Sequence, residues 1–470
     1  MKRSAAFSVL FLLLVLFAFP LRNVSAAEQE GVRGAFLDFI KDPFYTKTDE
    51  EATRYTPDGL LVLEDGKIKD FGSYAKLQAK YPGLKITSYA DRLIMPGFVD
   101  CHIHYPQTKV IAEYGSQLLE WLAKYIFPEE MHFKNKAYAD AVAKVFFQDL
   151  LRNGTTTAQV FTTTYPDSVD AFFEEASHLN MKMIAGLTGL DRKGEAPAAY
   201  LDTAQGFYDD SKKLIQKWHN KGRNLYAVTP RFAVGSTQEQ LNLSGKLYKE
   251  FPGVYVNTHM SENVKEIAEV AKLFPNSKDY LNVYEQAGIV GPRFTAGHSV
   301  HLDKSEFERM SKAGATAGFC PSSNLFLGSG LFKLQNAKSV ETPIRVCMGS
   351  DVGAGNYFSM LRVMNDAYKV AMLQNTKVSG FKGLYLLTLG GANALYLDDK
   401  LGNFNPGKEA DFIVLDWMVI PELAYRNQTA TAKNVGDLED KVFGMMTLGD
   451  DRVVDKTYVA GKLVYERSQK

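Results

Sequence analysis

The sequence predicts an α/β protein: a TIM-like (β/α)8 barrel together with a small β-sandwich assembled from both ends of the chain. Between residues 96 and 400, short apolar runs typical of strands alternate with helical stretches such as 138–152, 167–179 and 236–250. Repeated alternation of this kind indicates a parallel sheet, and at this length a closed barrel is the economical arrangement. A chain of 470 residues with a hydrophobic fraction of 46% can bury a large core.

The two flanks of the predicted barrel are rich in β-strand signals. Residues 59–68 predict two short strands around an Asp65-Gly66 turn, and residues 411–416 and 453–464 predict further strands near the C-terminus. We expect these segments to pair with one another. The predicted organisation is therefore a sandwich from 27–95 and 401–470, with the catalytic barrel over 96–400.

Residues 1–26 resemble a signal peptide. Two basic residues precede an apolar run over 5–19, Pro20 ends the run, and Val24-Ser25-Ala26 supplies the small residues of a cleavage site. The run is shorter than the ~20 residues that span a membrane. We expect export to the periplasm or medium, cleavage after Ala26 and no membrane span after processing; an uncleaved anchor is the alternative.

Charge and cysteine content narrow the function further. The chain has 54 basic and 54 acidic residues, so it lacks the positive balance of a nucleic-acid or polybasic membrane binder. A small, roughly neutral substrate fits better. The cysteines Cys101, Cys320 and Cys347 lie in apolar runs and are expected to be free core residues, because a disulfide framework usually uses an even number.

Metal-ligating residue types follow four predicted strands, which cover 93–100, 254–258, 294–297 and 344–349. They are His102 with His104, His259 with Glu262, His298, and Asp351. Strands alternate their side chains, so His102 and His104 point the same way. Barrel active sites lie at the C-terminal strand ends, and imidazoles with a carboxylate suit zinc or iron. The sequence therefore predicts a metal-dependent hydrolase.

Several motifs carry a family resemblance. Residues 96–104 and 402–412 resemble segments of the amidohydrolase superfamily. Residues 104–107, 119–125, 230–232, 259–262 and 320–325 resemble the corresponding motifs of guanine deaminases. The resemblance covers nearly all of the chain after residue 26. It implies a barrel enzyme that converts guanine to xanthine and ammonia, and a homodimer.

The resemblance also implies roles for individual residues. One zinc ion per chain, with iron(II) as the alternative, would be bound by His102, His104, His259 and Asp351. The catalytic residues would be Glu262, Asp351 and His298, with Glu262 as the proton carrier. The substrate would contact Gln107, Arg231, Phe232, His104, His259, Glu262 and Asp351.

The chemistry of guanine explains why these groups are needed. The C2 carbon is a poor electrophile and the amine a poor leaving group, whereas zinc lowers the pKa of bound water from 15.7 to about 7. Asp351 can take the proton of the water, and Glu262 can donate to the ring nitrogen beside C2 and then to the amine. Such acid–base help contributes roughly 10²–10⁴-fold. Arg231 and Gln107 offer matched hydrogen-bonding groups to the base.

Other functions and ligands remain open at this point. The same barrel could hydrolyse a pterin, a triazine or an oxidised purine, or could serve as a non-catalytic binding protein. Lys182 could bridge two metals as a carbamate, although a single Asp and the His259/Glu262 spacing favour one metal. The cytidine-deaminase fold is excluded, because its H-x-E and P-C-x-x-C elements are absent from the sequence. The remaining histidines are interpreted as structural: His132, His178, His219 and His301.

Overall fold

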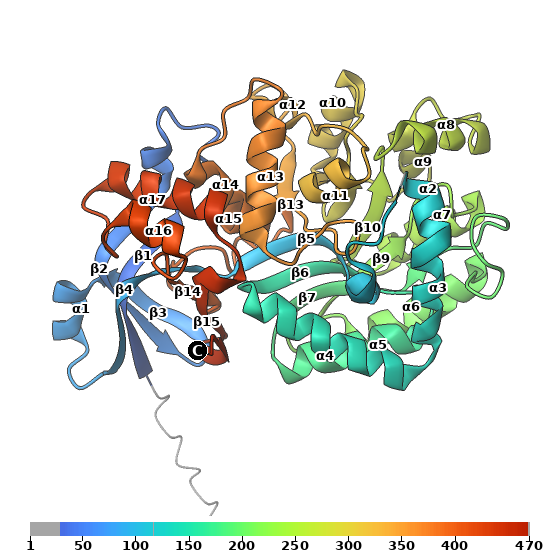
Figure 1. Ribbon diagram of the computed structural model, residues 1–470. Helices are drawn as coiled ribbons and strands as arrows, with labels where there is room; N and C mark the ends of the chain where they lie inside the picture. The colour runs from blue at the N-terminus through green and yellow to red at the C-terminus, as the bar shows by residue number, and fades with distance from the viewer. Residues whose placement is uncertain (1–28, 116, 469–470) are drawn as a thin grey trace, which may run out of the picture.

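The computed structural model describes residues 29–115 and 117–468, and most of them belong to a nearly closed parallel barrel (Figure 1). Its strands, in order around the barrel, are β5 (Phe98–His104), β6 (Thr155–Phe161), β7 (Lys182–Gly186), β9 (Leu225–Pro230), β10 (Tyr255–Met260), β11 (Phe294–His298), β12 (Thr316–Phe319) and β13 (Arg345–Met348). A two-residue strand, β8 (Thr188–Gly189), extends β9 by pairing with it.

Backbone hydrogen bonds join the first strand to the chain that follows the last one. The Asp351 amide donates to the His102 carbonyl at 2.8 Å, and the His104 amide donates to the Val352 carbonyl at 3.1 Å. These bonds lie at the C-terminal end of β5. The ring of strands therefore closes at the end where the predicted site residues lie.

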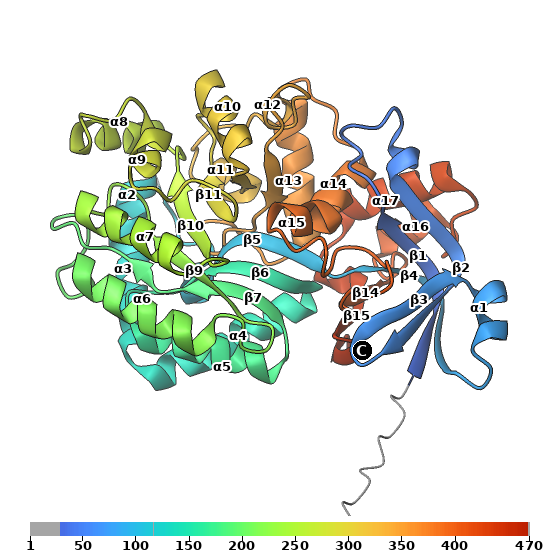
Figure 2. The ribbon, with the colours of Figure 1, turned by 180° about the vertical axis from the view of Figure 1, so that it is seen from behind.

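Helices cover the outside of the barrel (Figures 1 and 2). The main ones are α4 (Lys136–Arg152), α5 (Pro166–His178), α6 (Ala204–Trp218), α7 (Gln238–Glu250), α8 (Val264–Leu273), α9 (Tyr280–Gln286), α10 (Lys304–Ala313), α13 (Met360–Met372), α14 (Gly380–Leu387) and α15 (Leu389–Ala394). Three match predicted helices to within two residues: α4, α5 and α7. Helix α8 begins at Val264, where Asn263 and Glu266 form a capping box.

Short helical segments follow β5 and β12 and cover the C-terminal end of the barrel. They are η2 (Tyr105–Val110), α2 (Leu118–Trp121), η3 (Leu122–Ile126), α3 (Phe127–Glu130), η4 (Met131–Lys134), α11 (Pro321–Phe326) and α12 (Leu334–Ala337). Within residues 29–115 and 117–468 we find no helix with the length and apolar character needed to cross a membrane.

The strands of the two chain ends form one mixed seven-stranded sheet. Its order is β16 (Lys462–Glu466), β15 (Val454–Val459), β14 (Phe412–Leu415), β4 (Lys85–Pro96), β1 (Gln29–Phe39), β2 (Thr53–Glu64) and β3 (Lys67–Ser73). N-terminal and C-terminal strands lie side by side, as Figure 1 shows in blue and red, because β4 pairs with β14. The sheet encloses a core of its own that includes Phe36, Leu61 and Phe412. The predicted fold class, a (β/α)8 barrel with a small β domain built from both ends of the chain, is confirmed, and the strands predicted as a β-sandwich lie in one mixed sheet.

The remaining elements surround the small sheet. They are η1 (Asp49–Ala52), α1 (Tyr74–Lys80), α16 (Pro421–Asn427), α17 (Val435–Leu448) and η5 (Asp451–Val453). Two predicted strands differ from the structure. The run 93–100 is divided at Gly97, with β4 in the small sheet and β5 in the barrel. Only glycine fits at this junction, because a Cβ at Gly97 would lie 2.1 Å from Thr156 Oγ1. The run 453–464 is a hairpin of β15 and β16, turning at Ala460-Gly461.

The three cysteines are buried and free, as expected. Lys182, considered above as a bridging ligand, begins β7 and therefore lies at the N-terminal end of the barrel. Its Nζ pairs with Glu409 Oε1 at 2.9 Å. This position is opposite the strand ends that carry the histidines, so Lys182 does not bridge metals at that site.

A buried arginine joins the barrel to the small sheet. Arg223, just before β9, donates through Nη2 to Glu409 Oε2 at 2.6 Å and through Nη1 to Asp411 Oδ1 at 3.0 Å. Its side chain is only 10% exposed, and that of Asp411 is 2% exposed. Removing one partner of such a cluster leaves a buried charge without compensation.

We predict that Arg223→Ala lowers the free energy of unfolding by about 3–5 kcal/mol, the usual cost of breaking a buried ion pair. Urea denaturation at neutral pH measures this change. Arg33→Ala is the control, because Arg33 pairs with Asp58 at the surface, where solvent screening leaves an ion pair with little effect on stability. Equal losses in the two variants would contradict a stabilising role for the Arg223 cluster.

Candidate metal centre and substrate pocket

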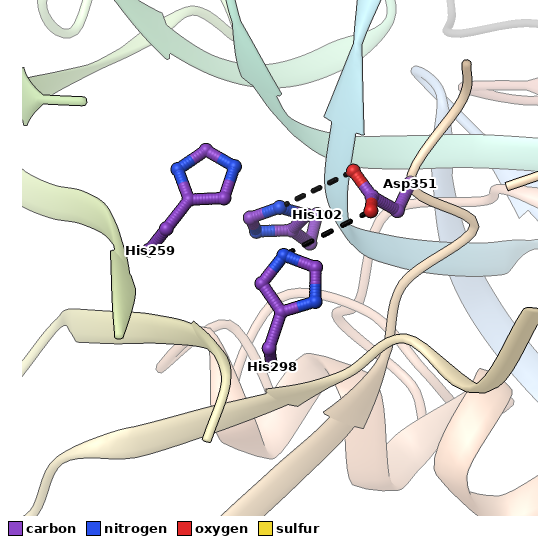
Figure 3. A group of neighbouring side chains, drawn as sticks. All are labelled: His102, His259, His298 and Asp351. Carbon is purple, nitrogen blue, oxygen red and sulfur yellow. Dashed lines mark ion pairs between the residues drawn. The ribbon is translucent and has the colours of Figure 1, made fainter. Parts of the chain in front are cut away.

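Four side chains from different strand ends converge at the C-terminal end of the barrel (Figure 3). They are His102 of β5, His259 of β10, His298 of β11 and Asp351 after β13. One ligating atom from each lies within 4.8 Å of those of the others, a spacing that could hold a metal ion. His298, expected only beside the metal, is thus a member of the compact group.

His104 adjoins this group from the same strand as His102. Its Nε2 lies 3.2 Å from Asp351 Oδ1 and 3.2 Å from His259 Nε2. His102 Nε2 lies 3.5 Å from the same carboxylate oxygen. The alternation of β5 therefore places both imidazoles at Asp351, as predicted.

Hydrogen bonds at Nδ1 orient the rings of His259 and His298. His259 Nδ1 lies 2.8 Å from the Arg231 carbonyl, and His298 Nδ1 lies 2.9 Å from Asn324 Oδ1. Since a carbonyl oxygen only accepts, each Nδ1 carries the proton and each Nε2 offers a lone pair. Partners of this kind fix the tautomer of metal-binding histidines.

The charge states of the cluster fit a metal ion. Burial lowers the pKa of His102, lowers that of His104 to about 3 and brings that of His259 well below its usual range, so these rings are neutral. Burial alone would raise the pKa of Asp351, but the close contacts with the His102 and His104 rings hold that pKa well below the ordinary value. Neutral imidazoles and an ionised carboxylate are the ligand forms that metals require.

Unpaired nitrogens point to the same conclusion. Within the described part of the chain, both ring nitrogens of His102, Nδ1 of His104 and Nε2 of His298 are buried without a hydrogen-bond partner. A buried polar atom left unpaired costs about 1–3 kcal/mol. A bound cation would offset that cost at the nitrogens facing the cluster, and the donor set of imidazoles and carboxylate fits zinc or iron.

Two glycines make room for the His102 ring. A Cβ at Gly297 in β11 would lie 2.2 Å from His102 Cε1, and a Cβ at Gly349 would lie 2.6 Å from His102 Cβ. Both distances are far below van der Waals contact. The strands on either side of the barrel therefore accept a buried imidazole only because these positions lack side chains.

Glu262 lies beside the cluster in the turn before α8. Its Oε2 is 3.4 Å from His298 Nε2, and Ser329 Oγ donates to its Oε1 at 3.2 Å. Burial, together with the nearby Asp351 charge, raises the pKa of Glu262 to about 8. A carboxyl group of this kind can hold and release a proton near neutral pH.

The predicted substrate contacts face the cluster from neighbouring elements. Gln107 in η2 accepts a hydrogen bond from the Gly353 amide at 3.1 Å through Oε1 and donates through Nε2 to Glu130 Oε1 at 3.0 Å. Arg231, directly after β9, donates through Nη1 to both oxygens of Glu130 at 3.0 and 2.8 Å. Phe232 is 4% exposed and follows Arg231 into the same space.

These residues surround one pocket with about 380 Å³ of empty space, its mouth included. Its lining consists of His104, Gln107, Leu118, Trp121, Leu122, Arg231, Phe232, His259, Glu262, His298, Leu327, Asp351 and Ala354. Every predicted site residue except the deeper His102 is in this lining. The apolar members cover the polar ones, as is usual for a small-molecule site.

Four residues with evident supporting roles were missed by the sequence analysis: Glu130, Tyr200, Asn324 and Ser329. Asn324 lies inside the motif 320–325, which therefore gave a signal for it. Nothing marked Glu130, because an acidic residue in a short Pro-containing helix is also typical of a solvated helix end. Its partners Gln107, Tyr200 and Arg231 are distant in sequence and meet it only in the folded chain.

Comparison with known proteins identifies the family. The model of the amidohydrolase family matches residues 93–464. The guanine deaminase of Escherichia coli K12 is 47% identical over 442 residues, which cover 93% of this chain and 98% of that enzyme.

Solved structures agree with the sequence relatives. The crystal structure of guanine deaminase from Bradyrhizobium japonicum superimposes with a TM-score of 0.91 at 48% identity, covering 94% of this chain and all of that one. A guanine deaminase from C. acetobutylicum with guanine bound in its active site gives a TM-score of 0.82 at 28% identity, covering 93% of this chain and all of that one.

The same comparisons correct one prediction. Export to the periplasm or medium, with cleavage after Ala26, is wrong: the match to the Escherichia coli guanine deaminase takes in 98% of that enzyme and 93% of this chain, and nothing in it supports export. The prediction was based on residues 1–26, which lie outside the described residues. The family match over residues 93–464, together with the sequence and structural relatives, shows that the chain belongs to the amidohydrolase family, among the guanine deaminases.

Proposed function

We propose that this protein hydrolyses guanine to xanthine and ammonia with one zinc ion per chain, iron(II) being the alternative metal. The observation that carries the proposal is a single pocket in which a histidine–aspartate cluster and Glu262 face Arg231 and Gln107. This arrangement brings a hydrolytic centre to groups that match the edge of a guanine base. Relatives named guanine deaminases align with nearly the whole chain.

The metal would be held by His102, His104, His259 and Asp351, with His298 beside it. When bound, zinc supplies a Lewis acid that makes water a nucleophile at neutral pH. The tautomers of His259 and His298 are fixed, because the Arg231 carbonyl and Asn324 Oδ1 accept their Nδ1 protons and leave each Nε2 with a lone pair.

The proton transfers belong to the two carboxyl groups. Asp351 accepts a proton from the water that attacks C2 of guanine, since its low pKa leaves it as the ionised carboxylate. Glu262, with a pKa raised to about 8 by burial, gives a proton to the ring nitrogen beside C2. Glu262 then takes the proton of the new hydroxyl at C2 and passes it to the departing amine, so that ammonia leaves instead of an amide anion. The proton held by Asp351 returns to Glu262 and restores the starting state.

Recognition of the base rests on fixed donors and acceptors. Arg231 has only donors, so it binds the carbonyl oxygen at C6 of guanine and repels the amine at C6 of adenine. Phe232 packs against the ring, and the apolar side chains of Leu118, Trp121 and Leu122 exclude water. Mismatched polar groups in such a buried site give roughly 10³-fold discrimination or more.

A substrate panel tests the proposed function. Purified zinc-loaded protein is mixed with guanine, adenine, cytosine, a pterin and a triazine, and loss of substrate absorbance and release of ammonia are followed. We expect kcat/KM for guanine to exceed that for adenine by ~10³-fold or more. Comparable values for adenine and guanine would contradict the recognition by Arg231, and turnover of another ring alone would contradict the function.

We further propose a homodimer, on the resemblance to guanine deaminases, and domain limits of 27–95 and 401–470 for the small β unit with 96–400 for the barrel. The end of β4 at Pro96 and the start of β14 at Phe412 support these limits. Light scattering of the purified protein tests the dimer: a mass near 52.4 kDa would indicate a monomer and contradict it.

We predict that His102→Ala and His104→Ala bind substantially less than one zinc per chain, because each removes an imidazole next to Asp351. His298→Ala should keep its zinc and lose activity. Elemental analysis of folded protein measures the content. Zinc loss in His298→Ala equal to that in His102→Ala would place His298 among the ligands, and two metals per chain in the wild type would contradict the single site.

We predict that Glu262→Gln keeps fold and zinc but loses turnover by roughly 10²–10⁴-fold, the usual contribution of a general acid–base. The amide keeps the size and the hydrogen bond with Ser329 but carries no transferable proton. Steady-state kinetics and metal analysis of the same sample give both readings. Loss of metal in this variant would make Glu262 a ligand instead.

A further inference from the structure

Glu130 is a buried carboxylate that the mechanism above does not use. It ends α3, away from the barrel strands, and is fully buried. Its Oε1 accepts from Gln107 Nε2 and Arg231 Nη1, both at 3.0 Å, and its Oε2 accepts from Arg231 Nη1 at 2.8 Å and from the Tyr200 hydroxyl. The oxygens therefore receive four hydrogen bonds from three distant parts of the chain.

These bonds fix the orientation of both proposed base contacts. The Gln107 amide lies between Glu130, which only accepts, and the Gly353 amide, which only donates, so its nitrogen and oxygen cannot exchange places. One hydrogen and one lone pair of that amide remain for a ligand. Arg231 donates to Glu130 through Nη1, so its Nε and Nη2 are not used by that carboxylate.

The carboxylate also cancels the charge of Arg231. Arg231 and Glu130 have side chains that are 3% and 0% exposed, so solvent screens neither charge. Without Glu130, Arg231 would present an uncompensated positive charge to the ligand and attract anions. With it, the Arg231–Glu130 pair presents oriented donors of no net charge, which suits a neutral base with a carbonyl oxygen.

We propose that Glu130 is a positioning and specificity-determining residue, which aligns Arg231 and Gln107 for guanine and disfavours binding of the xanthine anion. Where guanine has an amine at C2 and an unprotonated ring nitrogen beside it, xanthine has a carbonyl and a ring N–H. Xanthine is the more acidic of the two bases, and it becomes an anion at mildly alkaline pH. A pocket that repels the anion releases this product more readily. This inference rests on the proposed guanine deaminase function.

Glu130→Gln tests the inference with Glu129→Gln as a matched control. Glu129 is the adjacent glutamate of the same helix, is also buried and also accepts from a tyrosine, Tyr138, whereas the hydrogen bonds of Gln107 and Arg231 go to Glu130. Zinc content and unfolding of both variants are measured first. Kinetics with guanine and inhibition by xanthine across a pH range follow.

We expect Glu130→Gln to lose about 100-fold in kcat/KM for guanine, mainly through KM, as for other misplaced substrate contacts. In Glu130→Gln, the inhibition constant of xanthine should be about tenfold lower at alkaline pH than at acidic pH, because the xanthine anion then meets an uncompensated Arg231. A merely structural residue would not change this pH dependence. Glu129→Gln should match the wild type in both respects.

A double variant keeps the test decisive if Glu130→Gln does not fold. Arg231→Gln with Glu130→Gln removes both buried charges together, which proteins tolerate better than removing one. Since Glu130 acts chiefly through Arg231, the double variant should lose less than about tenfold in kcat/KM beyond Arg231→Gln alone. A larger further loss would overturn the inference.

Other outcomes separate this inference from the proposed function. A wild type that turns over guanine, with Glu130→Gln equal to it in KM and in the pH dependence of xanthine inhibition, overturns only the role of Glu130. A wild type with no turnover of guanine overturns the proposed function and this inference together.

Discussion

The site depends on the closure of the barrel between its first and last strands. The Asp351 amide donates to the His102 carbonyl, and the His104 amide donates to the Val352 carbonyl, at 2.8 and 3.1 Å. Asp100 reinforces the seam, since its Oδ1 accepts from the amides of His102 and Ser350. Residues almost 250 positions apart are thereby held at hydrogen-bonding distance, and the carboxylate of Asp351 reaches both imidazoles of β5.

The cluster that results has the features of a cation-binding site. Burial keeps the imidazoles neutral and leaves several ring nitrogens unpaired, while Asp351 stays ionised in the same small space. A cation resolves both problems, because it takes up lone pairs and balances the carboxylate. The polar interior of this barrel end is thus explained by function and not by the stability of the apo chain.

On the substrate side of the pocket, protein side chains themselves balance the buried charge. Arg231 is buried, but Glu130 compensates its charge, and Gln107 and Tyr200 share the same carboxylate. The metal side and the base-binding side are connected through one residue, since the Arg231 carbonyl also accepts from His259 Nδ1. A change that moves the backbone at Arg231 would therefore disturb metal binding and base recognition together.

The sequence by itself determined the elements and the chemical types. Apolar runs and caps predicted α4, α5, α7 and the four strand ends, and the spacing of His102 and His104 put both on one face of β5. It could not show that one apolar run is divided between two sheets at Gly97, where only glycine fits because Thr156 lies against it across the fold. It could not find Glu130 or rank His298 within the cluster. Those features depend on distances between residues remote in the chain, and only tertiary packing sets such distances.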